Sequence, residues 1–360
     1  MSFSLDIPVI DIAASLTGDV DARKACALAL RRALEDVGFF QIVGHSVPAT
    51  LQKQFIAAIT AFFALPLAAK QAIGQDRSPC NRGYERIGIE RLEELEDNAT
   101  VEKKEGFTVR PERPLGKFMT GPNQWPARDL PGMADFEQTY MAYFAAVHQL
   151  STHMFRLMAL SLDLDEHYFD AFAADPDGIQ LCRSHHYPPN PIGDADDDKE
   201  GTTAQPKTGR GIGAHTDFGA LTLLLQDEIG GLQVLHKPSN TWHPVTPIQG
   251  AYVINIGDLM QRWTNDRYLS TMHRVMSPAS LKPRYSVAFF NDGALDTVIE
   301  AIPTCVAPGE TPKYGPLKVA DHLMRRYKQS YSIGGATIKT PEDMKPAAVA
   351  MDLPQTALAA

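Results

Sequence analysis

The sequence predicts a mainly β protein in which a largely helical first half precedes a β-sandwich or barrel. Three observations support this prediction. The 360 residues are 44% hydrophobic and 21% charged, which is the balance of an ordinary globular protein. Before about residue 175, apolar residues recur at helical spacing. After it, many short strand-like runs follow one another between turn signals, as in all-β folds.

The elements of the first half follow from their residue types. Residues 5–12 are rich in β-branched side chains and predict a strand, which Pro8 confines to an edge or a strand start. Gly38 is expected to end the first helix, because glycine readily adopts the conformation found after a helix C-terminus. Pro, Gly and charged residues make 76–132 irregular, apart from a short strand at 106–109. The other predicted elements are helix 21–37, strand 39–43, helix 47–65, helix 133–162 and helix 166–174.

The second half is predicted to be rich in short strands. Residues 188–211 interrupt them with Pro, Gly, Thr and an acidic run, which indicates a solvated loop. A helix is expected at 319–330. The predicted strands are 179–187, 212–217, 220–226, 231–236, 242–247, 251–256, 270–276, 284–290 and 296–301. We therefore divide the chain into a mostly helical region (1–175), a β core with a C-terminal helix (176–333) and a peripheral tail (334–360).

Composition excludes several classes of protein. The formal charge is −9, whereas a broad nucleic-acid surface needs clustered Lys and Arg. The sequence contains no run of 18 apolar residues, which is about the length that a helix needs to cross a bilayer. The first residues lack the pattern of a secretory signal. The four cysteines form no C-x-x-C pair, so we expect reduced thiols. A cytoplasmic protein that binds neither nucleic acid nor membrane is the expectation.

A possible metal site stands at the start of the β-rich half. In Gly213–Gly219, read as GAHTDFG, His215 and Asp217 are two residues apart and so share one face of a strand. An imidazole and a carboxylate are two of the three ligands in the facial triad that holds non-haem Fe(II). His273 lies 56 residues after Asp217 in another strand-like run and is the candidate third ligand.

An anion site is predicted shortly afterwards. Arg284 and Ser286 are again two residues apart, and hence on one face of a strand. A guanidinium group binds a carboxylate with two parallel hydrogen bonds, and a neighbouring hydroxyl adds a third. A dicarboxylic co-substrate could use this pair as an anchor while its other end binds the metal.

These motifs, in this order, resemble the 2-oxoglutarate/Fe(II)-dependent dioxygenases. The isopenicillin N synthase-like family is the branch that the chain resembles, with plant flavonoid and alkaloid oxygenases and fungal enzymes such as thymine 7-hydroxylase. The resemblance covers the chain up to about residue 333. It rests on the motifs above together with IPVIDI (7–12), GFFQIVGHSVP (38–48), NRGY (81–84), HYPPNP (186–191), GAHTDFGALTLLLQD (213–227), GGLQVL (230–235), INIGDLMQRWTND (254–266) and STMHRV (270–275).

The resemblance implies a fold and a set of ligands. The fold is a double-stranded β-helix, or jelly roll, with flanking helices. His215, Asp217 and His273 match the iron ligands of the family. Arg284 and Ser286 match the pair that binds the far carboxylate of 2-oxoglutarate.

Further positions match the family less directly. Tyr187 matches a tyrosine that often contacts 2-oxoglutarate, and His185 stands where many plant relatives have an Asn with that role. The family places its substrate contacts around the iron, on the N-terminal segments and on the C-terminal helix. By that analogy the candidates are Phe218, Phe290, Asn291, Tyr84, Phe107 and Arg110. Because most of these are apolar or aromatic, we expect a mostly apolar small molecule.

The implied activity is oxidation of a small molecule, by hydroxylation, desaturation or rearrangement, in secondary metabolism. The cofactor would be Fe(II), with 2-oxoglutarate and O2 as co-substrates, succinate and CO2 as co-products, and ascorbate as the reductant in vitro. The presence of the Asp in H-x-D argues against a halogenase. Three alternatives stay open: an iron-dependent oxidase that uses no 2-oxoglutarate, a jelly-roll binding protein without enzymatic activity, and a zinc hydrolase with the same triad. The oligomeric state is not predicted.

Overall fold

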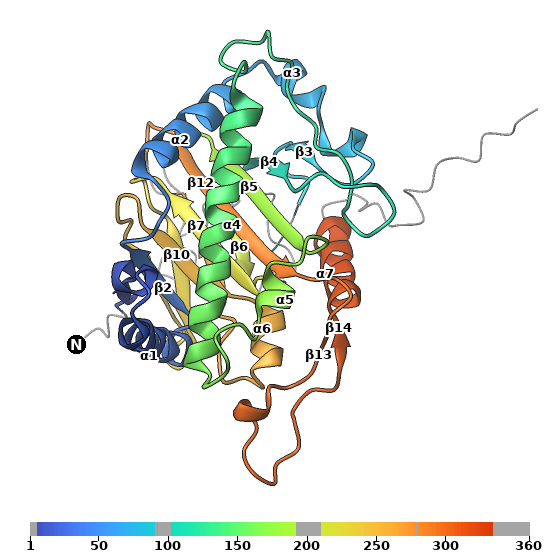
Figure 1. Ribbon diagram of the computed structural model, residues 1–360. Helices are drawn as coiled ribbons and strands as arrows, with labels where there is room; N and C mark the ends of the chain where they lie inside the picture. Colours follow the sequence, from blue (N-terminus) through green and yellow to red (C-terminus); the bar gives the residue numbers. More distant parts are fainter. Residues whose placement is uncertain (1–5, 91, 93–101, 192–209, 278–279, 334–360) are drawn as a thin grey trace, which may run out of the picture.

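The computed structural model describes residues 6–90, 92, 102–191, 210–277 and 280–333, and all that follows concerns this part of the chain. Two β-sheets face each other, and helices cover the outer face of the larger one (Figure 1). A cluster of buried apolar residues from both sheets fills part of the space between them; it includes Phe39, Ile212 and Val234. This arrangement is the expected double-stranded β-helix.

The larger sheet has eight strands within the described residues, in the order β1, β2, β10, β7, β12, β5, β4, β3. The first pair is parallel and the others are antiparallel. Strands from both halves of the chain therefore share one sheet. In sheet order the strands are Val9–Asp11, Phe39–Val43, Tyr252–Ile256, Leu221–Gln226, Arg284–Gly293, Ile179–Tyr187, Glu105–Val109 and Gly83–Glu85.

The smaller sheet faces the larger one with four antiparallel strands in the described chain. Their order is β6 (Ile212–His215), β11 (His273–Val275), β8 (Leu232–His236) and β9 (Thr241–Pro244). Two further short strands, β13 (Val298–Ile299) and β14 (Leu317–Lys318), pair with each other before the last helix.

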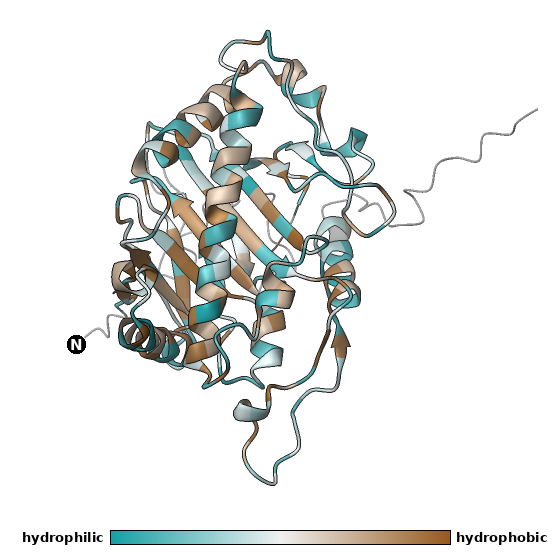
Figure 2. Cartoon of the chain, in the orientation of Figure 1, coloured by the Kyte–Doolittle hydropathy of each residue, from teal (hydrophilic) through white to brown (hydrophobic). Residues whose placement is uncertain are grey.

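Helices α1, α2 and α4 lie across the outer face of the larger sheet, with α4 crossing it along its length (Figure 1). Their apolar residues and those of the strands form the main core, in which the ring of Phe55 on α2 stacks on that of Tyr143 on α4 at 3.9 Å. Brown and teal residues share each of these helices in Figure 2, as expected for helices with one buried face. The helices are α1 (Val20–Asp36), α2 (Ala49–Phe63), α3 (Leu67–Gln71), α4 (Phe136–Ser161), α5 (Asp170–Ala173), α6 (Asp258–Trp263) and α7 (Val319–Ile333), with short 3-10 turns at Ala13–Leu16, Gln75–Arg77 and Pro303–Cys305.

Local signals set the ends of the first helix. The side chain of Asp19 accepts hydrogen bonds from the backbone N–H groups of Asp21 and Ala22, which have no partner inside the helix. Gly38 follows the helix with a φ of 75°, a conformation that costs glycine little. The chain then enters β2 directly, and this strand carries Phe39 to the inner face of the sheet.

Several predicted elements differ from the structure. The helix expected at 166–174 is confined to Asp170–Ala173, and the strand expected at 296–301 to Val298–Ile299. Strand β3 and helix α6 were not predicted, because three and six residues are too few to show a period. The tail 334–360 and most of the 188–211 loop lie outside the described residues. The division at residue 175 stays a prediction. None of the helices described is long and apolar enough to cross a bilayer.

Candidate active site

A pocket opens between the two sheets. One wall follows the inner face of β12, where side chains two residues apart point the same way. The opposite wall is the smaller sheet. A concave site of this kind, lined mostly by apolar side chains with a few polar groups, suits a small molecule. The β12 residues that line it are Arg284, Ser286, Ala288, Phe290 and Asp292.

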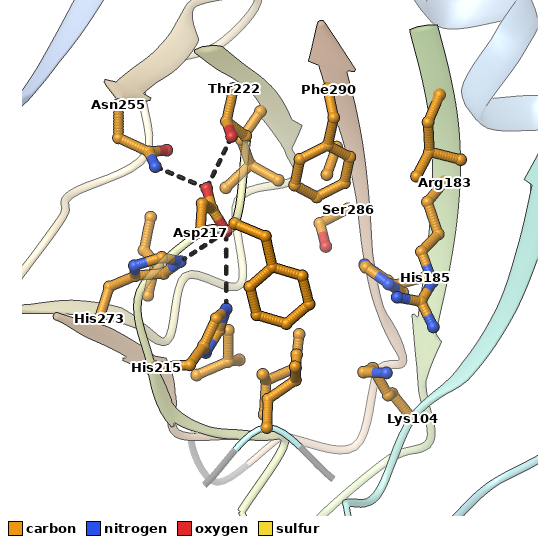
Figure 3. A pocket seen from close by; sticks show the side chains of 18 of the residues that line it. Lys104, Arg183, His185, His215, Asp217, Thr222, Asn255, His273, Ser286 and Phe290 are labelled. Atoms are coloured by element: carbon orange, nitrogen blue, oxygen red, sulfur yellow. Dashed lines mark hydrogen bonds and ion pairs between the residues drawn. The ribbon is translucent and has the colours of Figure 1, made fainter. Parts of the chain in front are cut away.

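Three buried side chains converge on one side of the pocket (Figure 3). His215 on β6 and His273 on β11 are directly opposite each other across the strand pair, and Asp217 follows β6. The Nε2 atom of each histidine lies 3.7 Å from Oδ1 of Asp217. This separation is too long for a hydrogen bond, but it suits three ligands of one ion, and the three ligand atoms lie within 4.8 Å of one another.

Backbone carbonyls orient both histidine rings. Nδ1 of His215 lies 2.8 Å from the carbonyl oxygen of Gly213, and Nδ1 of His273 lies 3.1 Å from that of Thr271. A ring whose Nδ1–H donates to a carbonyl presents the lone pair of Nε2 to a metal. Both lone pairs then face the space beside Asp217.

Two polar side chains hold the carboxylate of Asp217. The hydroxyl of Thr222 and the amide of Asn255 each donate a hydrogen bond of 2.6 Å to its Oδ2 atom. Oδ1 stays directed toward the histidines (Figure 3). Burial would raise the pKa of Asp217, but the adjacent imidazoles and these two hydrogen bonds lower it below its usual value. The residue is thus an ionised carboxylate at neutral pH, as a metal ligand must be.

Arg284 forms a buried cation site in the same pocket. Its guanidinium donates to the carbonyl oxygen of Gly230 at 2.5 Å, to the hydroxyl of Ser286 at 3.2 Å and to the side-chain oxygen of Gln226 at 3.2 Å. Within the described residues, no carboxylate lies at ion-pair distance from it, although Arg284 is only 2% exposed. A buried charge without a counter-ion is costly, so this site favours an anion.

Tyr187 and His185 border the Arg284 site from β5. The ring of Tyr187 lies under the guanidinium at 4.6 Å, and its buried hydroxyl has no hydrogen-bond partner in the described chain. The same holds for Nε2 of His185. Burial, and then the charges of Lys104, Arg183 and Arg284, lower the pKa of His185 well below its usual value, so the ring is neutral at pH 7. Both residues offer polar atoms for a bound ligand.

A network of charged side chains stands on the side of the pocket that faces the triad, and Glu90, Lys104 and Arg183 of this network line the pocket (Figure 3). Nζ of Lys104 lies 3.0 Å from Glu90, 3.3 Å from Glu102 and 3.7 Å from Glu85. The guanidinium of Arg183 pairs with Glu85 and lies 2.7 Å from Glu90. Burial would raise the pKa of Glu90, but the charges of Arg183 and Lys104 outweigh it and hold that pKa at about 2. We call these five residues the charged wall.

The predicted substrate residues separate into two groups. Phe218 and Phe290 line the pocket. Tyr84, Phe107, Arg110 and Asn291 do not. The hydroxyl of Tyr84 donates to Glu105 at 2.6 Å, Phe107 packs in the main core, and the amide of Asn291 donates to Ser151 at 3.0 Å. Arg110 is buried close enough to Asp292 for its charge to lower the pKa of that residue, but it does not itself line the pocket. Asn291 points away because it lies an odd number of residues from Arg284 on the same strand.

Sequence reasoning missed several residues of the site. Thr222 and Asn255 stand in mostly apolar strands, and a polar residue in such a strand usually has a buried partner, so a signal was present. Asp292 could have been found by extending the two-residue period of Arg284 and Ser286. The charged wall gave no signal, because four of its members lie in a stretch without periodicity and their partner Arg183 lies on a strand much further along the chain.

Comparison with known proteins agrees with this geometry. The model of the non-haem dioxygenase N-terminal region (DIOX_N, described as "non-haem dioxygenase in morphine synthesis N-terminal") matches residues 7–128. The model of the 2OG-Fe(II) oxygenase superfamily matches residues 178–293. The triad and Arg284 fall within the second match.

Curated relatives span nearly the whole chain. The 2-oxoglutarate-Fe(II) type oxidoreductase hxnY of Emericella nidulans is 42% identical over 331 residues, which cover 90% of each protein. Clavatol oxidase claD of Penicillium crustosum is 34% identical, over 92% of this chain and 98% of that protein. These relatives favour the dioxygenase over two of the alternatives, a binding protein without enzymatic activity and an oxidase that uses no 2-oxoglutarate.

Solved structures share the fold. A Neurospora crassa protein, solved at full length in complex with alpha-KG and thymine, is 31% identical and superposes with a TM-score of 0.76, over 89% of this chain and 96% of that one. The same protein with alpha-KG alone gives the same TM-score and identity. With its jelly-roll core and its pocket of His, Asp and Arg side chains, this chain belongs to the 2-oxoglutarate/Fe(II) oxygenase superfamily and is a dioxygenase that depends on Fe(II) and 2-oxoglutarate.

Proposed function

We propose that His215, Asp217 and His273 hold the Fe(II), and that Arg284 and Ser286 bind the far carboxylate of 2-oxoglutarate. The observation that carries this proposal is the buried Arg284, which has no carboxylate partner in the described chain and lines the same pocket as the triad. When bound, iron and 2-oxoglutarate supply the oxidation of a C–H bond by O2, with succinate and CO2 as co-products.

The chain itself binds, orients and shields the reactants. Thr222 and Asn255 fix the carboxylate of Asp217, so that one oxygen atom faces the iron position. The hydroxyl of Tyr187 and the neutral ring of His185 offer hydrogen bonds to 2-oxoglutarate without adding charge. Phe218 and Phe290 narrow the pocket beside the triad and restrict which C–H bond can approach it.

We infer that the substrate is a small molecule of secondary metabolism and that the enzyme acts in the cytoplasm. The position of the pocket between two sheets, where its lining residues are mostly buried, supports a small molecule over a nucleic acid or a protein. The relatives support it too, since one is named a clavatol oxidase and the Neurospora crassa protein is solved with thymine bound. Hydroxylation, desaturation and rearrangement all begin with removal of hydrogen from such a substrate, so all three fit this pocket.

Succinate formation tests the assignment of the site residues. Purified protein with Fe(II), ascorbate, O2 and 2-oxoglutarate should release succinate, and the correct small molecule in a metabolite library should stimulate the release. His215→Ala and Arg284→Ala should abolish the stimulation. The first should do so by loss of iron and the second by loss of 2-oxoglutarate binding.

Binding measurements without O2 separate these two causes. The Fe(II)·2-oxoglutarate chelate gives a weak visible charge-transfer band. His215→Ala should fail to form the band at any concentration of 2-oxoglutarate, whereas Arg284→Ala should form it only at high concentration. Unchanged bands in both variants would contradict the assignment.

A further inference from the structure

The strand that carries His215 lies at the edge of the smaller sheet. Within the described residues, β6 pairs with β11 alone. The pairing is also interrupted, because β6 has one more residue than β11 between the pairs at Ile212 and His215. An extra residue of this kind is a β-bulge, which breaks the ladder locally and redirects the side chains beside it. Strand pairing alone therefore does not fix the direction of the His215 ring.

Glu102 of the charged wall contacts this bulge from outside the sheet. Its Oε1 atom accepts a hydrogen bond from the backbone N–H of Gly213 at 3.2 Å and another from that of Leu92 at 2.9 Å. Beside it, the backbone N–H of Lys103 donates to the carbonyl oxygen of Arg210 at 3.1 Å. The segment around Glu102 thus runs along the start of β6 and holds it in place.

Gly213 connects this contact to the triad. Its N–H donates to Glu102, and its carbonyl oxygen lies 2.8 Å from Nδ1 of His215. One residue therefore joins the buried carboxyl group to the imidazole ring. A displacement of Gly213 would turn the ring and move Nε2 away from its place beside Asp217, and partners that orient a metal ligand in this way contribute to metal affinity.

The other two carboxylates of the charged wall have different contacts. Glu85 and Glu90 contact the two cations of the wall. Glu102 contacts one of these cations as well, with Oε2 at 3.3 Å from Nζ of Lys104, but it also bonds to the backbone of β6. Burial does not separate them, since Glu85 and Glu102 are each 3% exposed. The distinguishing feature of Glu102 is its bond to Gly213.

We propose that Glu102 is a positioning residue for the iron site: it holds the bulge of β6 through the N–H of Gly213 and thereby aims the imidazole of His215 at the metal. The reach of its side chain to Gly213 serves this purpose, and its negative charge does not. Through Glu102 the charged wall is joined to the iron side of the pocket. This inference rests on the proposed function, because it takes His215 as an iron ligand.

Two substitutions of Glu102 separate reach from charge. Glu102→Asp keeps the charge beside Lys104 but draws the carboxylate back from Gly213 by one methylene group. Glu102→Gln loses the charge but keeps an acceptor oxygen at the same distance along the side chain. In titrations of the full chain with Fe(II) without O2, Glu102→Asp should bind iron about tenfold more weakly than the wild type. Glu102→Gln should bind iron as the wild type does, although its unfolding midpoint falls.

Hydrogen exchange reports on β6 without any metal. The exchange rate of the Gly213 amide is followed by NMR in the metal-free full chain, with the amide of Leu223 on β7 as the internal reference. Glu102→Asp should speed the exchange of Gly213 about three- to tenfold, because the amide loses its acceptor, and leave Leu223 unchanged. A general loss of stability would speed both amides, so the two causes are distinguished.

Glu85→Asp is the matched control. It shortens a glutamate of the same wall with the same burial, and it leaves the contact with β6 intact. Its iron affinity and the exchange of Gly213 should equal those of the wild type.

The outcomes distinguish this inference from the proposed function. If His215→Ala loses iron but Glu102→Asp binds it as tightly as the wild type, the inference is wrong and the ligand assignment stands. A loss in Glu102→Gln as large as that in Glu102→Asp would also overturn it, because charge would then be the cause. If the wild type binds no Fe(II), or His215→Ala binds it equally well, both proposals fail.

Discussion

The two sides of the pocket are built in different ways. On the iron side, neutral groups position the ligands: backbone carbonyls orient both histidines, and Thr222 and Asn255 hold Asp217. On the other side, the five acidic and basic side chains of the charged wall position one another. The first arrangement joins strands of the later half of the chain, and the second joins an irregular stretch of the earlier half to Arg183 on β5. We therefore expect substitutions on the iron side to change chemistry, and substitutions in the charged wall to change stability.

The largest effect on stability is expected for Glu90→Gln. It leaves Lys104 and Arg183 with one fewer counter-ion and should lower the free energy of unfolding by about 3–5 kcal/mol at pH 7. The pKa of Glu90 is lowered from its usual 4.5 to about 2 in the fold, so its stabilisation is complete above pH 4.5 and is lost as pH falls toward 2. Urea unfolding at several pH values should show the two proteins converging over that range.

A surface carboxylate provides the control for Glu90→Gln. Glu137 pairs with the exposed Arg128, so Glu137→Gln should cost no more than about 1 kcal/mol. Equal costs for the two substitutions would show that the charged wall contributes little to stability.

Arg284→Lys should act on 2-oxoglutarate instead of on the fold. Lysine keeps the charge but loses the planar pair of donors, so KM for 2-oxoglutarate should rise about 10- to 100-fold. Affinity for Fe(II) and the unfolding midpoint should stay near those of the wild type. Steady-state kinetics gives KM for 2-oxoglutarate, and titration gives the affinity for Fe(II), so an effect on the co-substrate is separated from an effect on the metal. A change in iron affinity alone would refute the role of Arg284.

Thr222→Val should weaken iron binding by about tenfold. The substitution keeps the shape of the side chain but removes the hydrogen bond to Oδ2 of Asp217, and groups that orient a metal ligand usually contribute this much. Titration of Fe(II) without O2 gives the affinity. Thr241→Val, which changes a hydroxyl on β9 outside the pocket, should leave it unaltered.

The smallest effect is expected for Arg326→Gln. Loss of the cation over the ring of Phe218 should lower kcat/KM for the small-molecule substrate about two- to fivefold, because such contacts are weak where solvent is near. KM for 2-oxoglutarate should not change, since Arg326 lies on α7 and does not line the pocket. A parallel change in both constants would show a general disturbance of the pocket.

The sequence predicted the iron side better than the charged wall, for a physical reason. His215 and Asp217 are close in sequence, and the pleat of a strand fixes which neighbours share a face. The same rule places Asn291 outside the pocket and Asp292 inside it. Asn291 was chosen as a substrate contact, and Asp292 was missed, because the two-residue period was not followed to the end of β12. The triad residues lie together, and their role as ligands stays a proposal.

Glu85, Glu90, Glu102, Lys104 and Arg183 could not be placed together in the same way. Their proximity depends on the pairing of β3 with β4 and of β4 with β5. Strand β3 has three residues and lies in a stretch without periodicity, so no local pattern reveals that pairing. The sheet order of the core is a property of the whole chain.

The mixed origin of the larger sheet also limits how the polypeptide can be cut. β10 pairs with β2 and β5 pairs with β4, so strands of the later half complete their hydrogen bonding with strands of the earlier half. A fragment made from residues 176–333 would expose two unpaired edges. Such edges bind other chains and promote aggregation. The change of composition near residue 175 is therefore a poor place to truncate the enzyme, even though it is the most visible boundary in the sequence.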